Sequence, residues 1–180
     1  MIIFREAVSA ADLEIVRTLL REYGTYLNGS VGAQHICLES YEQELAGLPA
    51  PYQPPTGLIL LALVDEKPAG VIALKPLKPL RSLFPDERAC EMKRLWVSAG
   101  YHGLGLGKKL SEELMARAAA LGYTAIYLDT MPKTMQNANH IYAQLGFTPV
   151  ERYTDNLILR LGTGCEDNSS PEVVFFRRPL

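Results

Sequence analysis

Residues 91–109 read EMKRLWVSAGYHGLGLGKK and hold a strand, a glycine-rich turn and the start of a helix in direct succession. The strand ends in an apolar, β-favouring run that stops at residues 98–100. Glycine then occupies every second position, at Gly103, Gly105 and Gly107, and a helical pattern begins directly after them. Such a junction gathers backbone N–H groups at the positive end of a helix. It predicts a binding site for an anion such as a phosphate or pyrophosphate.

The whole chain has the size and composition of one domain, residues 1–180. Its net charge of −2 gives no global field that would hold nucleic acid or an anionic membrane, so its partners depend on a local site. Cys37, Cys90 and Cys165 are odd in number and far apart, which favours a reducing compartment, and we expect the cytoplasm. Charges at residues 5 and 6 argue against a signal peptide, and the longest apolar run, residues 58–64, is too short to span a membrane.

Periodicity along the chain predicts both strands and helices. Ser9 and Asp12 have the spacing of a helix N-terminal capping box, and the helix that they open should end near residues 26–29. The other expected helices cover residues 39–48, the segment from the glycines to Gly122, and the segment between Pro132 and Gly146. The expected strands are residues 2–4, 58–64, 69–75, the strand holding Glu91, 125–129, 147–153, 157–161 and 173–176. This order predicts an α/β fold whose sheet has both parallel and antiparallel pairs.

Two well-known glycine loops do not fit the turn. A dinucleotide-binding G-x-G-x-x-G motif would need glycine at Lys108 or Leu110, depending on where it starts. A P-loop that ends in Gly107 and Lys108 would need glycine at His102 and serine or threonine at Lys109. The predicted anion site therefore belongs to another class.

The run His102-Gly103-Leu104-Gly105-Leu106-Gly107 resembles the coenzyme A loop of the GNAT N-acetyltransferase superfamily, Q/R-x-x-G-x-G/A at a strand-to-helix junction, with His102 in place of Gln or Arg. The run Tyr142-Ala143-Gln144-Leu145-Gly146-Phe147 is similar to the superfamily's second signature, Y-x-x-x-G-F, and Met135 stands where many relatives have asparagine. The similarity covers about residues 58–153. It implies the GNAT acyl-CoA N-acyltransferase fold, a mixed central sheet with splayed strands flanked by helices.

The resemblance implies an enzyme that moves an acetyl group from acetyl-CoA directly to a primary amine of a small molecule or peptide. Glu91 would be the general base, acting through water, and Tyr142 the general acid. The cofactor-binding residues that the resemblance implies are Leu95, Trp96, Val97, His102, Gly103, Leu104, Gly105, Leu106, Gly107 and Lys108. The partners would be acetyl-CoA and an amine acceptor; a homodimer is allowed, and no nucleic acid or membrane is expected. His35, His102 and His140 share no ligand spacing, so we expect no metal.

Acetyl transfer sets a requirement on each of these groups. A primary amine with a pKa of about 10.4 is protonated at neutral pH, so a base must take its proton. Glu91 would start from a pKa of about 4.3, so its role requires that partial burial raise that value. The backbone N–H of Val97 is expected to receive the charge that develops on the thioester oxygen. Tyr142 is expected to donate a strong hydrogen bond to the leaving thiolate, because full proton transfer is uphill by about 2 kcal/mol.

Each residue also has a purely structural interpretation. Glu91 could be an exposed strand residue, Tyr142 and Trp96 could be core residues, and Lys108 could be an ordinary solvated lysine. A non-catalytic acyl-CoA-binding sensor would keep the glycine loop and have no use for Glu91 or Tyr142. The superfamily also allows another acyl-CoA or an oxygen acceptor.

The sequence carries little information about the acceptor. The resemblance places the acceptor pocket beside residues 22–48 and 151–172, which hold no recognisable motif. The acidic residues that could hold a cationic amine there are Glu22, Glu39, Glu151 and Asp155. A surface position explains each of them equally well.

Overall fold

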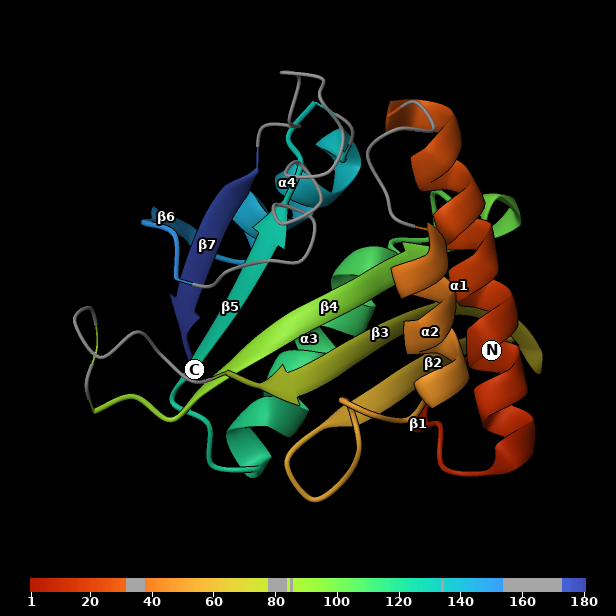
Figure 1. The fold of residues 1–180 in the computed structure, drawn as a ribbon, viewed down its shortest axis with the longest axis horizontal. Coiled ribbons are helices and arrows are strands. Elements are labelled where there is room, and N and C mark those ends of the chain that lie inside the picture. The colour runs from red at the N-terminus through yellow and green to blue at the C-terminus, as the bar shows by residue number, and fades with distance from the viewer. Residues whose placement is uncertain (32–37, 78–83, 85, 134, 154–172) are drawn as a thin grey trace.

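The computed structural model describes residues 1–31, 38–77, 84, 86–133, 135–153 and 173–180. Within them, one sheet of seven strands runs in the order β1-β2-β3-β4-β5-β7-β6 (Figure 1). The strands are β1 (Ile2–Glu6), β2 (Leu58–Val64), β3 (Lys67–Pro76), β4 (Ala89–Val97), β5 (Ala125–Thr130), β6 (Thr148–Val150) and β7 (Val174–Pro179). The helices are α1 (Ala10–Val31), α2 (Leu38–Gly47), α3 (Leu106–Ala120) and α4 (Gln136–Gln144), with a 3-10 turn η1 (Ala99–Tyr101) between β4 and α3. The mixed α/β architecture predicted from the sequence is confirmed.

The sheet opens between β4 and β5. Neighbouring strands elsewhere in the described sheet are antiparallel, whereas these two run parallel and pair only over residues 89–91 and 125–127. Beyond those three pairs the strands diverge (Figure 1). The splayed strands that the family resemblance implies are therefore present.

One extra residue in β4 lies opposite β3. Val71 pairs with Trp96 and Ala73 pairs with Lys93, so one residue of β3 faces two residues of β4. Arg94 lies in this bulge with a φ of 61°, which is uncommon for a residue other than glycine.

The bulge changes which side chains share a face of the sheet. Met92 and Leu95 are three positions apart, yet both pack into the core beneath α3. Arg94 pairs with Glu44 of α2, and Trp96 packs against α1. A strand without the bulge would place residues 92 and 94 on the same face.

Helices cover both faces of the sheet. α1 and α2 lie on one face and α3 on the other (Figure 1). The buried stripe predicted for α3 is confirmed and consists of Leu106, Leu110, Leu114 and Ala118. Across the described ranges, no helix combines the length and apolar character needed to cross a membrane.

The start of α1 is capped as the sequence predicts, but its end is different. The Asp12 N–H donates to Ser9 Oγ at 3.1 Å, and the Ser9 N–H donates to Asp12 Oδ2 at 3.1 Å. α1 then continues to Val31, past the end predicted at residues 26–29. Glycine lowers helix propensity without forcing a helix to stop, so Gly29 is accommodated inside α1.

The C-terminal strands also differ from the prediction. β6 is shorter than the expected strand at residues 147–153 at both ends. Its start is one residue later because the Phe147 N–H closes α4, donating to the Tyr142 carbonyl at 3.1 Å, and its pairing with β7 stops at Val150. Gly146 has a φ of 77° and occupies the predicted C-terminal cap. The expected strand at 173–176 falls within β7 apart from its first residue, and the one at 157–161 lies outside the described residues.

Candidate active site

The glycine loop presents a row of backbone amides at the start of α3. Gly103 and Gly105 have φ angles of 84° and 69°, and Gly105 is the N-cap residue of this 15-residue helix. Within the part of the chain that the structure describes, nothing accepts a hydrogen bond from the N–H groups of residues 103–108. Free amides at the positive end of a helix form an anion site.

The three glycines differ in what a side chain would meet. A Cβ at Gly103 or Gly105 would meet no atom within 4 Å, so the left-handed backbone is what favours glycine there. A Cβ at Gly107 would lie 3.0 Å from Cδ1 of Ile141 in α4. Gly107 therefore lets α3 and α4 pack closely.

His102 ties the loop to the end of β4. Its Nε2 lies 2.9 Å from the Val97 carbonyl oxygen. Its own N–H donates to the Ala99 carbonyl at 3.2 Å, so this amide is satisfied within the protein. The available amides are those that follow it.

Val97 points its backbone groups into the opening of the sheet. The Ser98 N–H donates to the Ala69 carbonyl of β3 at 2.9 Å. Backbone groups of successive residues in an antiparallel pair point alternately toward and away from the partner strand. The Val97 N–H and carbonyl therefore point away from β3, where the carbonyl meets His102.

A pocket that is open to solvent lies where β4 and β5 separate. Its walls come from β4, the end of β5, α1 and α4. The lining residues are Tyr23, Met92, Lys93, Arg94, Leu95, Asp129, Thr130, Met131, Met135 and Tyr142. Two site residues proposed from the sequence, Leu95 and Tyr142, thus share one pocket, whereas Glu91 does not line it.

Tyr142 is a buried residue of α4 with only 6% of its surface exposed. Its ring packs edge-on against Phe147, with centroids 5.8 Å apart. Burial raises the pKa of its hydroxyl well above the ordinary value, so the group stays protonated at neutral pH. Among the described residues the hydroxyl has no hydrogen-bond partner.

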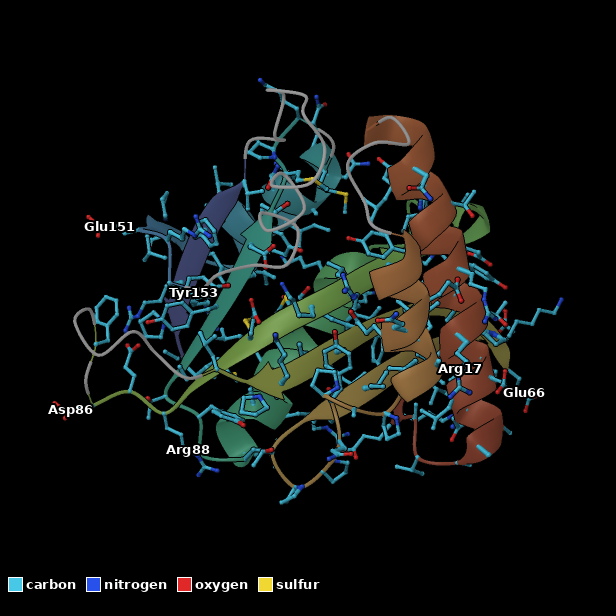
Figure 2. All side chains as sticks on the ribbon, viewed as in Figure 1. Arg17, Glu66, Asp86, Arg88, Glu151 and Tyr153 are labelled. Atoms are coloured by element: carbon cyan, nitrogen blue, oxygen red, sulfur yellow. The ribbon has the colours of Figure 1, made fainter. Side chains whose placement is uncertain are left out.

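Glu91 is fully buried in β4, with 1% of its surface exposed. Its Oε2 lies 2.9 Å from Lys75 Nζ, and its Oε1 lies 3.3 Å from Lys93 Nζ. The Tyr153 hydroxyl also donates to Oε1, at 3.0 Å. Figure 2 shows Tyr153 over the arm of the sheet formed by β5 and β7, where its ring packs against Tyr127 and Phe175.

The expected rise in the pKa of Glu91 is wrong. Burial does favour the neutral acid, but Lys93 and Lys75, together with the hydrogen bond from Tyr153, favour the carboxylate more strongly. The pKa of Glu91 therefore lies below its ordinary value. Glu91 is an anion held between two cations.

Lys93 connects Glu91 to the opposite strand. Its ammonium forms an ion pair with Asp129 of β5, and both side chains are largely buried. Burial alone would lower the pKa of Lys93, but Asp129 and Glu91 outweigh it and raise the pKa. The four groups form a charge-balanced row, Lys75, Glu91, Lys93 and Asp129.

The remaining proposed residues lie around the loop. Trp96 packs against Tyr23 and Tyr26 of α1, with ring centroids 5.6 and 5.3 Å away, and its indole N–H donates to Glu22 at 3.2 Å. Lys108 lies 4.0 Å from Glu112 on the surface of α3. Leu104 is exposed and Leu106 is buried.

The other acidic residues considered for the acceptor are dispersed. Glu151 points outward beside the edge strand β6 (Figure 2). Glu39 belongs to α2, and Asp155 lies outside the described residues.

Sequence reasoning missed Lys75, Lys93, Asp129 and Tyr153. Lys93 had a signal, because it lies two residues after Glu91 on a strand and therefore on the same face. The other three come from different strands and from the segment after β6, and no local pattern links them to Glu91.

A comparison with protein families matches residues 16–147 to the acetyltransferase (GNAT) family. A Schizosaccharomyces pombe protein named as an uncharacterized N-acetyltransferase is 32% identical over 148 residues, which cover 82% of this chain and 83% of that protein.

Solved acetyltransferase structures share the fold. An acetyltransferase from Streptococcus agalactiae superposes with a TM-score of 0.70 at 22% identity, covering 99% of this chain and 98% of that one. The PaiA N-acetyltransferase from Thermoplasma acidophilum, solved in complex with coenzyme A, gives a TM-score of 0.67 at 18% identity over 100% and 99% of the two chains. The family match, together with the splayed sheet and its glycine loop, shows that this chain belongs to the acetyltransferase (GNAT) family and is an acetyltransferase.

Proposed function

We propose that the protein is an acetyl-CoA-dependent N-acetyltransferase whose acceptor is a primary amine of a small molecule or peptide. The observation that carries this proposal is the row of free amides at residues 103–108 next to a pocket that contains Tyr142. The two features meet near Gly107, where an added Cβ would lie 3.0 Å from Ile141, the neighbour of Tyr142 in α4. The structural relative solved with coenzyme A supports the choice of cofactor.

The amides of residues 103–108 would hold the pyrophosphate of coenzyme A. The N-terminus of α3 favours that charge through its backbone dipoles. This accounts for the tolerance of His102 at a position where relatives have Gln or Arg. Leu95 on the pocket wall and the Val97 N–H at the strand end would lie along the acyl arm, and the Val97 N–H would stabilise the developing oxyanion.

Tyr142 is the proposed general acid. It lines the pocket, remains protonated at neutral pH, and has a hydroxyl with no partner among the described residues. Its raised pKa makes complete proton transfer to a thiolate still less favourable than for an ordinary tyrosine. Tyr142 therefore acts as a hydrogen-bond donor to the departing sulfur.

Glu91 is the proposed proton acceptor for the amine and would act through water, because its side chain does not line the pocket. Lys93 and Lys75 lower its pKa, so it is a weaker base than this role was expected to require. Transfer would be direct, without an acyl-enzyme intermediate. Cys90 is fully buried, and burial raises the pKa of its thiol to about 12, which leaves almost no thiolate to attack a thioester.

A non-catalytic sensor of acyl-CoA is the second candidate. A sensor would need the backbone amides of residues 103–108. It would need neither the buried Glu91 nor a Tyr142 hydroxyl in the pocket that has no hydrogen-bond partner among the described residues. The presence of both groups supports the enzyme. An enzyme of the same fold that uses another acyl-CoA is a narrower alternative.

Calorimetric titration with acetyl-CoA, followed by a thiol-release assay over a panel of amines, tests the proposal. Glu91→Gln and Tyr142→Phe should bind acetyl-CoA like the parent and lose about 10²-fold or more in turnover. Equal binding with equal, trivial turnover in all three proteins would support the sensor. Faster thiol release from propionyl-CoA or a longer thioester would support the other acyl donor.

A further inference from the structure

We infer that Asp129 is the carboxylate that meets the acceptor amine in the pocket, and that the Lys93 ammonium joins Asp129 and Glu91 into one proton-accepting pair. The catalytic part of this inference rests on the proposed function. The coupling of the two carboxylates through Lys93 rests on the geometry alone.

Access to the pocket distinguishes the two carboxylates. Asp129 lines the pocket together with Tyr142, whereas Glu91 does not. Each oxygen of Glu91 already has a donor, Lys75 on Oε2 and both Lys93 and Tyr153 on Oε1. An amine in the pocket therefore meets Asp129 first, and Glu91 can be reached only through water.

The ion pair of Lys93 with Asp129 stands where the sheet divides. Glu91 and Tyr127 form the last backbone pair between β4 and β5. Lys93 and Asp129 each lie two residues further along their strands and therefore on the same face as that pair. The ion pair between Lys93 and Asp129 thus replaces the next backbone pair and connects β4 with β5.

The Lys93 ammonium lies between the two carboxylates. Its Nζ lies 3.3 Å from Glu91 Oε1 and is paired with Asp129 at the same time. Two buried carboxylates with no cation between them would disfavour double ionisation. Lys93 is therefore a positioning residue that sets the charge state of the pair.

The proposed step balances as follows. The ammonium first loses one proton to solvent. The neutral amine nitrogen then forms its bond to the acyl carbon while an N–H proton moves to an Asp129 oxygen, which later releases that proton to the departing sulfur or to solvent. The C–S bond then breaks, and the sulfur takes the hydrogen bond from Tyr142 or a proton from solvent. Once Asp129 is neutral, the Lys93 ammonium remains paired with Glu91, so the charge change stays local.

The other groups around this row are compatible with the assignment. Lys75 is paired with Glu91, and Arg94 is paired with Glu44 of α2. The tyrosines that Asp129 influences electrostatically are Tyr23, Tyr142 and Tyr153. Burial raises the pKa of all three hydroxyls, so they are neutral at neutral pH.

Steady-state kinetics of Asp129→Asn, Glu91→Gln and the double variant test the pair. Asp129→Asn should lower kcat by about 10²-fold or more and leave the KM for acetyl-CoA within about twofold, because its contact is with the amine. The double variant should be about as slow as the slower single variant, since the two residues act as a unit. A kcat for Asp129→Asn within about threefold of the parent, or losses that multiply in the double variant, would overturn the inference. Asp86→Asn, on an exposed aspartate, is the matched control.

The Lys93→Met and Lys93→Arg variants test the coupling. Lys93→Met should move the acid limb of kcat/KM to higher pH by about one unit or more, and Lys93→Arg should restore the parent profile. Titration of the side-chain carboxyl carbon of Glu91 by ¹³C NMR gives a readout without turnover, and Lys93→Met should raise its midpoint, because Lys93 favours the carboxylate. An unchanged midpoint would refute the coupling even if no amine substrate is found, whereas a parent with no amine-dependent thiol release would count against the proposed function alone.

Discussion

For Tyr142, removal of one oxygen atom separates the role of the ring in packing from the role of the hydroxyl in chemistry. Tyr142→Phe keeps the ring contact with Phe147 and removes only the hydroxyl. We expect kcat to fall by about 10²-fold, because the departing thiolate loses its hydrogen-bond donor, while the affinity for acetyl-CoA changes by about twofold or less. Stopped-flow thiol release and calorimetry measure the two quantities.

The matched control for Tyr142 is Tyr127→Phe. Tyr127 is also buried, but its hydroxyl donates to Glu87. This variant should lose stability and keep its turnover per folded molecule. A Tyr142→Phe protein with parental kcat would remove the general acid from the mechanism.

Asp12 gives the fold a defined acid sensitivity. The Ser9 N–H and the pairing with Arg5 hold the pKa of Asp12 down to about 2, below the value of about 3.9 in an unfolded chain. This interaction stabilises the fold above about pH 4 and is lost as the pH falls toward 2. Asp12→Asn should therefore lower the urea midpoint at pH 6 and match the parent near pH 2. An equal difference at both pH values would show that the charge of Asp12 is not the cause.

At the scale of elements, two substitutions in the glycine loop separate the effect of backbone strain from that of a side-chain contact. Gly105→Ala places a side chain at a φ of 69°, which costs about 1 kcal/mol or more and reorients the amides. We expect the Kd for coenzyme A to rise by about tenfold. Gly107→Ala meets only the flexible end of Ile141, so its Kd should stay within about threefold of the parent. Calorimetry on both variants checks the order, and a larger loss for Gly107→Ala would contradict it.

The bulge of β4 is fastened to α2 by one ion pair. Arg94 pairs with Glu44, whose side chain is 20% exposed, and Arg94 also lies over the ring of Tyr41. Arg94→Met should lower the free energy of unfolding by about 2 kcal/mol, because it leaves a mostly buried carboxylate without its cation. The double variant Arg94→Met and Glu44→Met should recover part of the lost free energy of unfolding, as measured by urea unfolding. A double variant less stable than Arg94→Met would argue against this cause.

Elements with strong local patterns could be predicted, and features that depend on strand pairing could not. The stripe of α3, the capping box and the glycine turn are visible in nearby residues. The bulge at Arg94 is visible only once β4 lies against β3, because it is defined by a mismatch between the two strands. The surroundings of Glu91 could not be predicted for the same reason. Its partners are Lys75 of β3, Lys93 of its own strand and Tyr153, which follows β6.

At the scale of the whole molecule, a cofactor that contacts both arms of the sheet should stabilise it. Coenzyme A at 100 times its Kd adds about 2.7 kcal/mol, which for a chain of this size raises Tm by about 5 to 10 °C. Thermal unfolding with increasing coenzyme A measures the shift. Gly105→Ala should need a higher concentration for the same shift. Parental behaviour in that variant would place the binding site elsewhere.

The short parallel junction of β4 and β5 has a consequence for the life of the protein. Only three residues of each strand join the two arms through backbone pairs, and Lys93 with Asp129 is the next link. A substrate that contacts both arms would also stabilise the junction between β4 and β5. The concentration of acyl thioester in the cell would then determine how often this junction unfolds locally and becomes accessible to proteases. Starvation for the thioester would shorten the half-life of the enzyme as well as its turnover.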